Sequence, residues 1–301
     1  MRLLQKVFIR SKEEQKEEMK LSYLCIMFFL CLSNIITAQE KDTITVLLIG
    51  DSTTKGATPR RVKPNGIHLE ETIEQLSALE PFMPTVRVIN SSQGGETALS
   101  VVESGRYKKE IYPLRERRID YIFVRYGIND WFKCKNLKNE FPENLKSLLE
   151  KIKTDFPEAN LIPMTIVPFM PFDECEQVNE LITEVAQEMN LTMFDIYTPY
   201  KKAVVESGPD TYHVRRIELN KVDKKYHGWL KPYTYDYKQK GKNMKVVLAD
   251  DNSLDPILGK YKAWYYDRHP NLAGYHLIGY ETVEFLKKKL NKTFKQKSNY
   301  E

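Results

Sequence analysis

Five short runs of aliphatic, β-branched and aromatic residues recur along this chain, and helix-length segments separate most of them. The runs are ITVLLIG (44–50), TVRVIN (85–90), DYIFVRYG (120–127), NLIPMTIVP (160–168) and LTMFDI (191–196). Such runs predict buried strands, and the apolar spacing near 3.6 in residues 67–80, 141–157 and 174–190 predicts helices. Strands that alternate with helices indicate a parallel sheet covered on both faces, so we expect an α/β fold.

The alternation of strands and helices stops after the fifth run, between residues 197 and 263. This segment mixes lysines with aromatic residues, among them Tyr226, Trp229, Tyr233, Tyr235, Tyr237 and Tyr261. It is too long for a simple connection, so we expect an inserted lid or subdomain over the C-terminal sheet edge, within one domain of residues 39–301. Aromatic faces between lysines can stack nucleic-acid bases, but sugar rings also dock on them, and the modest net charge argues against nucleic acid.

The N-terminus has the plan of an export signal. A twelve-residue apolar run at 21–32 follows Lys20 and precedes a polar stretch, which is typical of a secretory signal and too short to span a bilayer. We therefore expect residues 1–38 to be a leader and signal peptide, with translation starting at Met1 or Met19, and the mature protein to be periplasmic or extracellular. A buried helix at 21–32, or a lipid anchor at a cysteine within it, fits these flanks less well.

Composition and cysteine usage set further bounds. Hydrophobic residues make up 42% of the chain and charged residues 29%, which excludes wholesale disorder and a multi-span membrane protein. Loss of the leader would remove six basic and four acidic residues and lower the net charge from +5 to +3. Cys134 and Cys175 would remain, either as one disulfide or as two thiols. No Cys-x-x-Cys or His-x-x-x-His pair predicts a metal site.

Four polar segments lie where predicted strands end or just before the last predicted helix (273–290). They are GDST (50–53), NSSQGGET (90–97), YGIND (126–130) and DRHPNLAGYH (267–276). The loops that leave the carboxyl ends of parallel strands converge on one crevice, so we expect these segments to meet.

Together the four segments hold every group that acyl transfer requires. The reaction needs a hydroxyl nucleophile, an imidazole base, an acid that orients the imidazole, and donors for an oxyanion. Ser52 supplies the hydroxyl, His269 the base and Asp267, two residues earlier, the acid. Gly95 offers an unobstructed N–H and Asn129 a side-chain amide as oxyanion donors. Ser52 alone would be an ordinary helix-capping serine, and the other groups favour the nucleophile.

This pattern resembles the SGNH hydrolases, also called the GDSL esterase and lipase superfamily, over residues 46–279. The resemblance implies a flavodoxin-like three-layer sandwich with about five parallel strands, an open site, and no metal or organic cofactor. It also implies that the backbone N–H of Ser52 is a third oxyanion donor. Gly94 and Gly95 stand in tandem; counting from Asn90 favours Gly95 as the glycine donor and leaves Gly94 as the alternative.

The sequence also favours one substrate class. Thr53 after the serine resembles the rhamnogalacturonan acetylesterase branch of that superfamily, and export with an aromatic insertion suits a polysaccharide. We therefore expect a serine esterase that removes O-acetyl groups from a carbohydrate. A lipase or lysophospholipase, which would expose an apolar rim, and a non-catalytic glycan-binding protein are the alternatives. Lys55, Arg60 and Arg61 either face an acidic glycan or only solvent.

Overall fold

The computed structural model describes residues 43–168, 171–239, 241–265, 267 and 269–298, without the side chains of 239 and 292–298. The chain divides into two units at residue 43, and the description below concerns the second unit together with Thr43, where its first strand begins. The predicted signal segment 1–38 therefore lies outside the described residues. Among the described residues, no helix is long and apolar enough to cross a membrane.

A four-stranded parallel sheet lies at the centre of the unit, in the order β2-β1-β3-β4. Its strands are β1 (Thr43–Gly50), β2 (Thr85–Asn90), β3 (Tyr121–Arg125) and β4 (Asn160–Pro163). Ile49 pairs with Val124 and Val124 with Pro163, so the strands end at a common edge.

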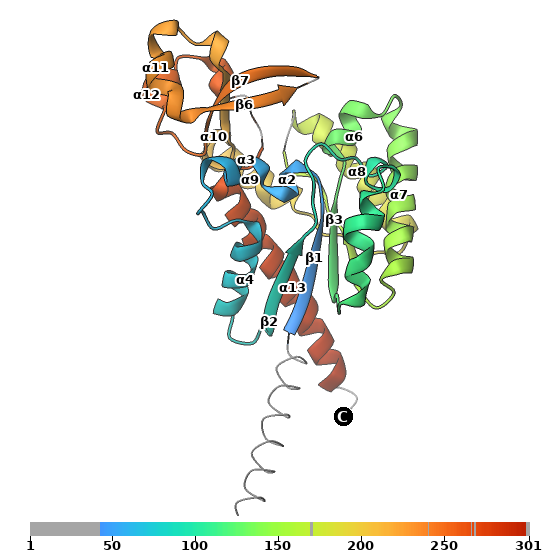
Figure 1. Ribbon diagram of the computed structural model, residues 1–301. Coiled ribbons are helices and arrows are strands. Elements are labelled where there is room, and N and C mark those ends of the chain that lie inside the picture. Colours follow the sequence, from blue (N-terminus) through green and yellow to red (C-terminus); the bar gives the residue numbers. More distant parts are fainter. Residues whose placement is uncertain (1–42, 169–170, 240, 266, 268, 299–301) are drawn as a thin grey trace, which may run out of the picture. The chain divides into compact units, whose positions relative to one another are not determined.

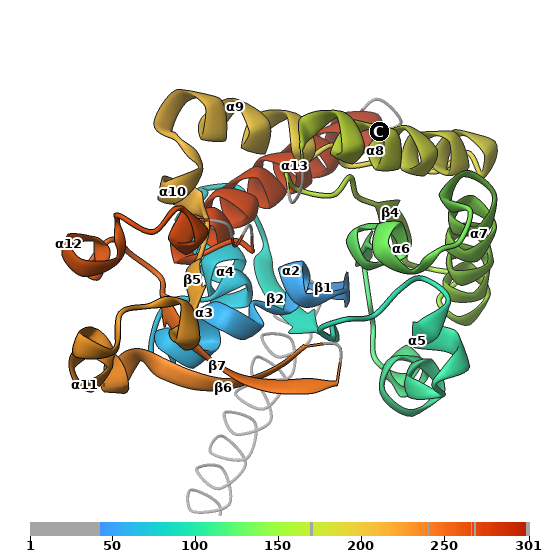
Figure 2. The same cartoon turned by 90° about the horizontal axis from the view of Figure 1, so that it is seen from above.

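Helices cover both faces of this sheet. The long ones are α4 (Leu69–Leu79), α7 (Leu137–Asp155), α8 (Phe172–Glu188), α9 (Tyr197–Ser207) and α13 (Leu272–Ser298). Alternate residues of β1 point to opposite faces: Leu47 and Ile49 pack with α7 and α8, whereas Val46 and Leu48 pack with α4, α9 and α13. Figures 1 and 2 show α4 and α13 on one side of the sheet and α7 and α8 on the other. The predicted three-layer α/β fold is confirmed.

The parallel sheet of the described residues has four strands, one fewer than the approximate five that were expected. Residues 191–196 contribute an isolated parallel bridge between Met164 and Phe194 instead of a fifth strand. The ladder stops there because the Thr165 hydroxyl accepts hydrogen bonds from the backbone N–H groups of Ile196 and Tyr197, both at 2.9 Å. These bonds turn the chain directly into α9, whose Tyr200 packs in the core. The alternation of strands and helices therefore continues through α9, and it stops after Ser207 instead of at residue 197.

A second, antiparallel sheet follows α9 and the short α10 (Pro209–Tyr212). It consists of β5 (Arg215–Glu218), β6 (Thr234–Gln239) and β7 (Lys242–Ala249) in the order β5-β7-β6. One face packs around Trp264 and Leu230, and the other meets Val62. We call residues 213–265 the three-stranded subdomain; it lies on the carboxyl-end side of the parallel strands (Figure 1). Its role as a lid remains a prediction.

Shorter helices complete the fold. They are α2 (Ser52–Lys55), α3 (Ala57–Val62), α5 (Ser100–Glu103), α6 (Ile128–Lys133), α11 (His227–Leu230) and α12 (Asp255–Leu258), with 3-10 turns at 112–116, 219–221, 224–226, 231–233 and 262–265 and a π turn at 107–111. Cys134 is partly buried and Cys175 is buried, and they form no disulfide with each other, which decides between the two cysteine alternatives.

Candidate active site

A sharp strand-to-helix turn presents Ser52 as the first residue of α2, directly after β1. Gly50 is required in this turn, because a Cβ atom there would lie 2.4 Å from Thr54 Oγ1 and 2.8 Å from the Arg125 carbonyl oxygen. Asp51 caps the helix: its Oδ1 accepts hydrogen bonds from the N–H and the hydroxyl of Thr53, both at 2.8 Å. The turn therefore fixes the backbone of Ser52 next to the sheet edge.

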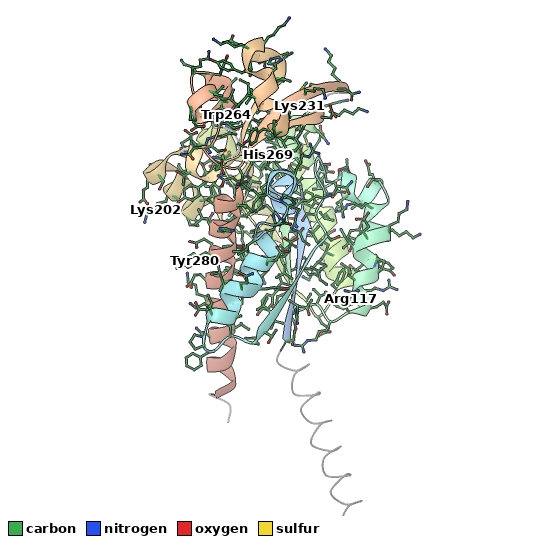
Figure 3. The ribbon with its side chains drawn as sticks, turned by 60° about the vertical axis from the view of Figure 1, so that its left-hand side comes forward. Arg117, Lys202, Lys231, Trp264, His269 and Tyr280 are labelled. Carbon is green, nitrogen blue, oxygen red and sulfur yellow. The ribbon has the colours of Figure 1, made fainter. Side chains whose placement is uncertain are left out.

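Ser52, His269 and Asp267 form a continuous chain of hydrogen bonds. Ser52 Oγ lies 3.1 Å from His269 Nε2, and His269 Nδ1 lies 2.6 Å from Asp267 Oδ1. The same Asp267 oxygen accepts the backbone N–H of His269 at 3.0 Å. Because the Nδ1–H of His269 donates to the Asp267 carboxylate, the Nε2 lone pair of His269 faces the serine hydroxyl. Figure 3 shows His269 beside the three-stranded subdomain.

The charges around His269 suit a general base. The side chain of Asp267 is only 2% exposed, and burial opposes its ionisation, but His269 and Arg216 lower its pKa to about 2. Burial also opposes a charge on His269, yet the Asp267 carboxylate and its hydrogen bond raise the pKa of His269 above its usual value. Asp267 therefore stays ionised and stabilises the imidazolium that would form when His269 takes a proton.

The predicted glycine segment lies beside this serine, and the Asn129 side chain contacts the glycine segment. The Asn129 side chain, in the first turn of α6, donates to the Glu96 carbonyl oxygen at 2.9 Å and keeps a second N–H. Gly94 is the glycine beside Ser52, since a Cβ atom on Gly94 would lie 3.6 Å from Ser52 Cβ. On Gly95, which has φ +80°, such an atom would meet nothing within 4 Å. This geometry favours Gly94, the alternative, over Gly95 as the glycine nearest the nucleophile.

A buried ion pair that the sequence analysis missed holds the glycine segment in place. Arg106 donates to both carboxylate oxygens of Glu96, with the Nη2 contact at 2.6 Å, and to the Ser91 carbonyl oxygen at 2.9 Å. Tyr126 donates its hydroxyl to the same Glu96 carboxylate at 3.0 Å. Glu96 and Tyr126 lie in segments that the sequence marked, but no local pattern reveals their contacts, because Tyr126 and Arg106 reach Glu96 only in the folded chain.

The remaining residues that the sequence marked lie outside this arrangement. Arg60 pairs with Glu70 at 2.5 Å, and Arg61 donates to the Asp236 carbonyl oxygen at 3.3 Å, so both arginines engage protein groups; Lys55 is exposed. Within the part of the chain that the structure describes, no group of three or more His, Cys, Asp or Glu side chains could hold a metal ion.

Comparison with known proteins identifies the family. The model of the GDSL-like lipase/acylhydrolase family matches residues 48–215, more than half of the chain. The chain therefore belongs to this family and is a serine ester hydrolase. None of the curated protein sequences compared with the chain matches it.

The chain is also similar to several solved structures at low identity. The chain is similar to Axe2, an acetylxylan esterase from Geobacillus stearothermophilus, with 20% identity and a TM-score of 0.43 over 55% of this chain and 80% of that one. It is also similar to LAE5, an alpha/beta hydrolase enzyme from the metagenome of Lake Arreo, with 17% identity and a TM-score of 0.48. This match covers 80% of this chain and 94% of that one. A third similar structure is a GDSL-like lipase from Parabacteroides merdae, with 16% identity and a TM-score of 0.43. The match covers 55% of this chain and 83% of that one.

Proposed function

We propose that this enzyme is exported and removes O-acetyl groups from a carbohydrate through an acyl-Ser52 intermediate. The observation that carries the proposal is the continuous contact from Ser52 Oγ to His269 Nε2, at 3.1 Å, and from His269 Nδ1 to Asp267, at 2.6 Å. A hydroxyl, an oriented base and an ionised acid in this order are the machinery of acyl transfer.

The proposed reaction has two halves. In the first, Ser52 Oγ bonds to the ester carbonyl carbon while His269 Nε2 takes the hydroxyl proton, and the carbonyl oxygen becomes an oxyanion. Asn129, the glycine segment and the Ser52 N–H are the proposed donors to that oxyanion. His269 then gives the proton to the departing sugar oxygen, which leaves acetyl-Ser52. In the second half, water attacks with His269 as base, and acetate and free Ser52 are released.

Three features support a carbohydrate substrate. The GDST motif and the predicted export signal are the first two. The third is the aromatic content of the three-stranded subdomain, where Trp229 is 52% exposed and its ring centroid lies 5.8 Å from that of Tyr233. An exposed aromatic pair of this kind suits the apolar face of a sugar ring.

One observation keeps the lipase alternative in view. Leu99 is 41% exposed and Phe132 is 64% exposed, and they follow the two predicted oxyanion segments in the chain. Apolar side chains at this point suit an acyl chain longer than acetate.

The central experiment compares p-nitrophenyl esters of increasing acyl length with the wild type and Ser52→Ala. We expect acetate to be cleaved best and Ser52→Ala to lose at least about a thousandfold in kcat. Ser92→Ala is the matched control, because Ser92 lies on the glycine segment and its buried hydroxyl bonds to no described residue.

A panel of acetylated polysaccharides then identifies the sugar by the acetate released. Preference for octanoate over acetate would establish the lipase alternative. If the wild type is as inactive as Ser52→Ala but still binds glycans, the protein is the non-catalytic glycan-binding alternative instead.

A further inference from the structure

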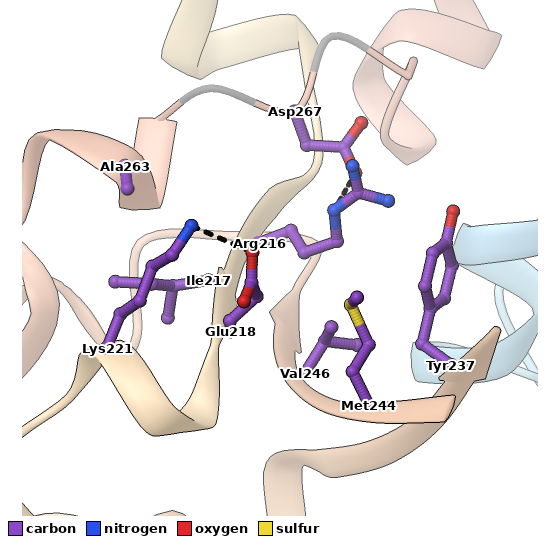
Figure 4. Close-up of a pocket in the computed structure, with 9 residues that line it drawn as sticks. All are labelled: Arg216, Ile217, Glu218, Lys221, Tyr237, Met244, Val246, Ala263 and Asp267. Carbon is purple, nitrogen blue, oxygen red and sulfur yellow. Dashed lines mark hydrogen bonds and ion pairs between the residues drawn. The ribbon is translucent and has the colours of Figure 1, made fainter. Parts of the chain in front are cut away.

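The two oxygens of the Asp267 carboxylate face different partners. Oδ1 receives both hydrogen bonds from His269, at 2.6 Å from Nδ1 and 3.0 Å from the backbone N–H. Oδ2 lies 3.0 Å from Nε of Arg216 (Figure 4). This second contact is an ion pair without the alignment of a hydrogen bond, so it acts mainly through charge.

Arg216 reaches Asp267 from the three-stranded subdomain and lies just beyond the residues that the family model matches. In β5 alternate side chains point to opposite faces. Arg216 therefore faces Asp267, whereas its neighbour Arg215 pairs with Asp255 at 3.3 Å on the other side. The Arg216 guanidinium also lies over the Tyr237 ring, 4.9 Å from its centroid.

The backbone connects the same strand to the same loop. Val214, directly before β5, donates its N–H to the His269 carbonyl oxygen at 2.8 Å, and His213 forms an antiparallel bridge with Pro270. The entry to β5 and the loop that carries His269 are thus fixed relative to each other, which places the guanidinium beside the carboxylate.

From these contacts we infer that Arg216 is a positioning residue: it holds the Asp267 carboxylate with Oδ1 toward His269 and so couples the three-stranded subdomain to the hydrolytic site. The inference rests on the proposed function of Ser52 and His269.

The charge of Arg216 acts on His269 as well. Among the described residues, the carboxylates of Asp267 and Asp51 favour the imidazolium of His269, and the Arg216 guanidinium opposes it. Removal of Arg216 removes this opposing charge, so the pKa of His269 rises and more of the base is protonated at a given pH.

The cavity beside Arg216 provides a matched control. It has a volume of about 320 Å³ and is also lined by Lys221, Tyr237, Met244 and Val246. Lys221 carries the same charge in the same cavity, but its ammonium pairs with Glu218 at 2.7 Å and not with Asp267. A general loss of positive charge from the cavity is therefore separable from loss of the Asp267 contact.

The test compares Arg216→Met, Arg216→Lys and Lys221→Met with the wild type, using the pH dependence of kcat/KM on p-nitrophenyl acetate. We expect Arg216→Met to lower kcat/KM at pH 6 about tenfold, as for other groups that orient a functional side chain. We also expect it to shift the acid limb, the fall of kcat/KM at low pH, to higher pH. Arg216→Lys should restore the position of the acid limb, and Lys221→Met should leave it unchanged.

The pKa of His269 is also measured directly by NMR titration of its ring C–H signals, assigned with His269→Ala. This titration needs no turnover, so an inactive wild type would contradict the proposed function while the Arg216 inference is still decided. An unchanged His269 titration in folded Arg216→Met, or an equal shift in Lys221→Met, would overturn the inference. If Arg216→Met does not fold, Arg216→Gln takes its place with the same expected shift.

Discussion

Arg125, at the end of β3, donates from Nη2 to the carbonyl oxygen of Thr53, 2.5 Å away in α2, and from Nε to the Thr54 hydroxyl at 3.1 Å. The guanidinium is buried, at 1% exposed, and so is the Asp51 carboxylate. Burial opposes both charges, lowering the pKa of Arg125 and raising that of Asp51, while each charge favours the other. The buried Arg125 guanidinium thus fixes the backbone and side chain of the two residues that follow Ser52 in α2.

Replacement of Arg125 should destabilise the protein more than an ordinary surface change. Arg125→Met leaves the Thr53 carbonyl and the Asp51 carboxylate buried without their cation, so we expect a loss of about 3 kcal/mol in the free energy of unfolding. Urea denaturation followed by circular dichroism measures it. Arg117→Met, at an exposed position labelled in Figure 3, should change stability by less than about 0.5 kcal/mol. Equal stability of the two variants would contradict this account.

The tandem glycines should respond differently to alanine. Gly94→Ala places a methyl group 3.6 Å from Ser52 Cβ, in ordinary contact with the protein but in the space where an ester must approach. We expect it to lower kcat/KM at least about tenfold with little change in stability. Gly95→Ala forces φ +80° on an alanine, so it should cost about 1 kcal/mol of stability.

Activity separates the two assignments of the oxyanion donor. Measured with p-nitrophenyl acetate, Gly95→Ala should stay closer to the wild type than Gly94→Ala does. The reverse order would restore Gly95, the donor that counting from Asn90 favours.

The sequence predicted those features that local patterns determine. The apolar runs and the helical spacing were enough to predict a sheet layer between two helix layers. The motif residues Ser52, Asp267 and His269 lie together as predicted, although 217 positions separate the serine from the histidine. The count of strands failed at residues 191–196, because the Thr165 hydroxyl ends the ladder through bonds that no periodicity reveals.

The residues that support the site were not predictable in the same way. Arg125 and Arg216 contact groups that are distant in sequence, Thr53 and Asp267. Arg106 pairs with Glu96, ten residues earlier, at a spacing that matches no helix or strand repeat. An isolated arginine looks the same in a sequence whether it is solvated or buried, so only the tertiary structure distinguishes these three from the many exposed ones.

The pH dependence of hydrolysis should report on His269. The neutral imidazole is the active form, and the Asp267 carboxylate raises the pKa of His269 above the usual 6.5 against the effect of burial. Activity should therefore fall as the pH drops through a value above 6.5, measured as kcat/KM for p-nitrophenyl acetate. Asp267→Asn should move this limb to lower pH and reduce kcat by roughly 10⁴-fold. A wild-type midpoint below 6.5 would contradict the prediction.

Asp130 should make the folded protein less stable as the pH rises. Its side chain is buried, and Oδ1 accepts the Ala98 N–H at 3.0 Å. Burial raises its pKa from 3.8 to about 7, with a further contribution from the Asp51 charge, although the bond from Ala98 opposes the shift. Because the folded-state pKa exceeds that of the unfolded chain, the stabilisation is complete below about 4 and is lost as the pH rises through about 7.

Asp130→Asn keeps an oxygen for the Ala98 N–H but cannot ionise, so it should remove this pH dependence. Between pH 4 and pH 8 the wild type should lose about 2 to 4 kcal/mol more of its free energy of unfolding than the variant does. Urea denaturation at both pH values measures the difference, with Glu158→Gln, at an exposed position, as the control that should behave like the wild type. If Asp130→Asn and the wild type lose the same stability over this range, Asp130 is already ionised in the folded protein and the burial argument fails.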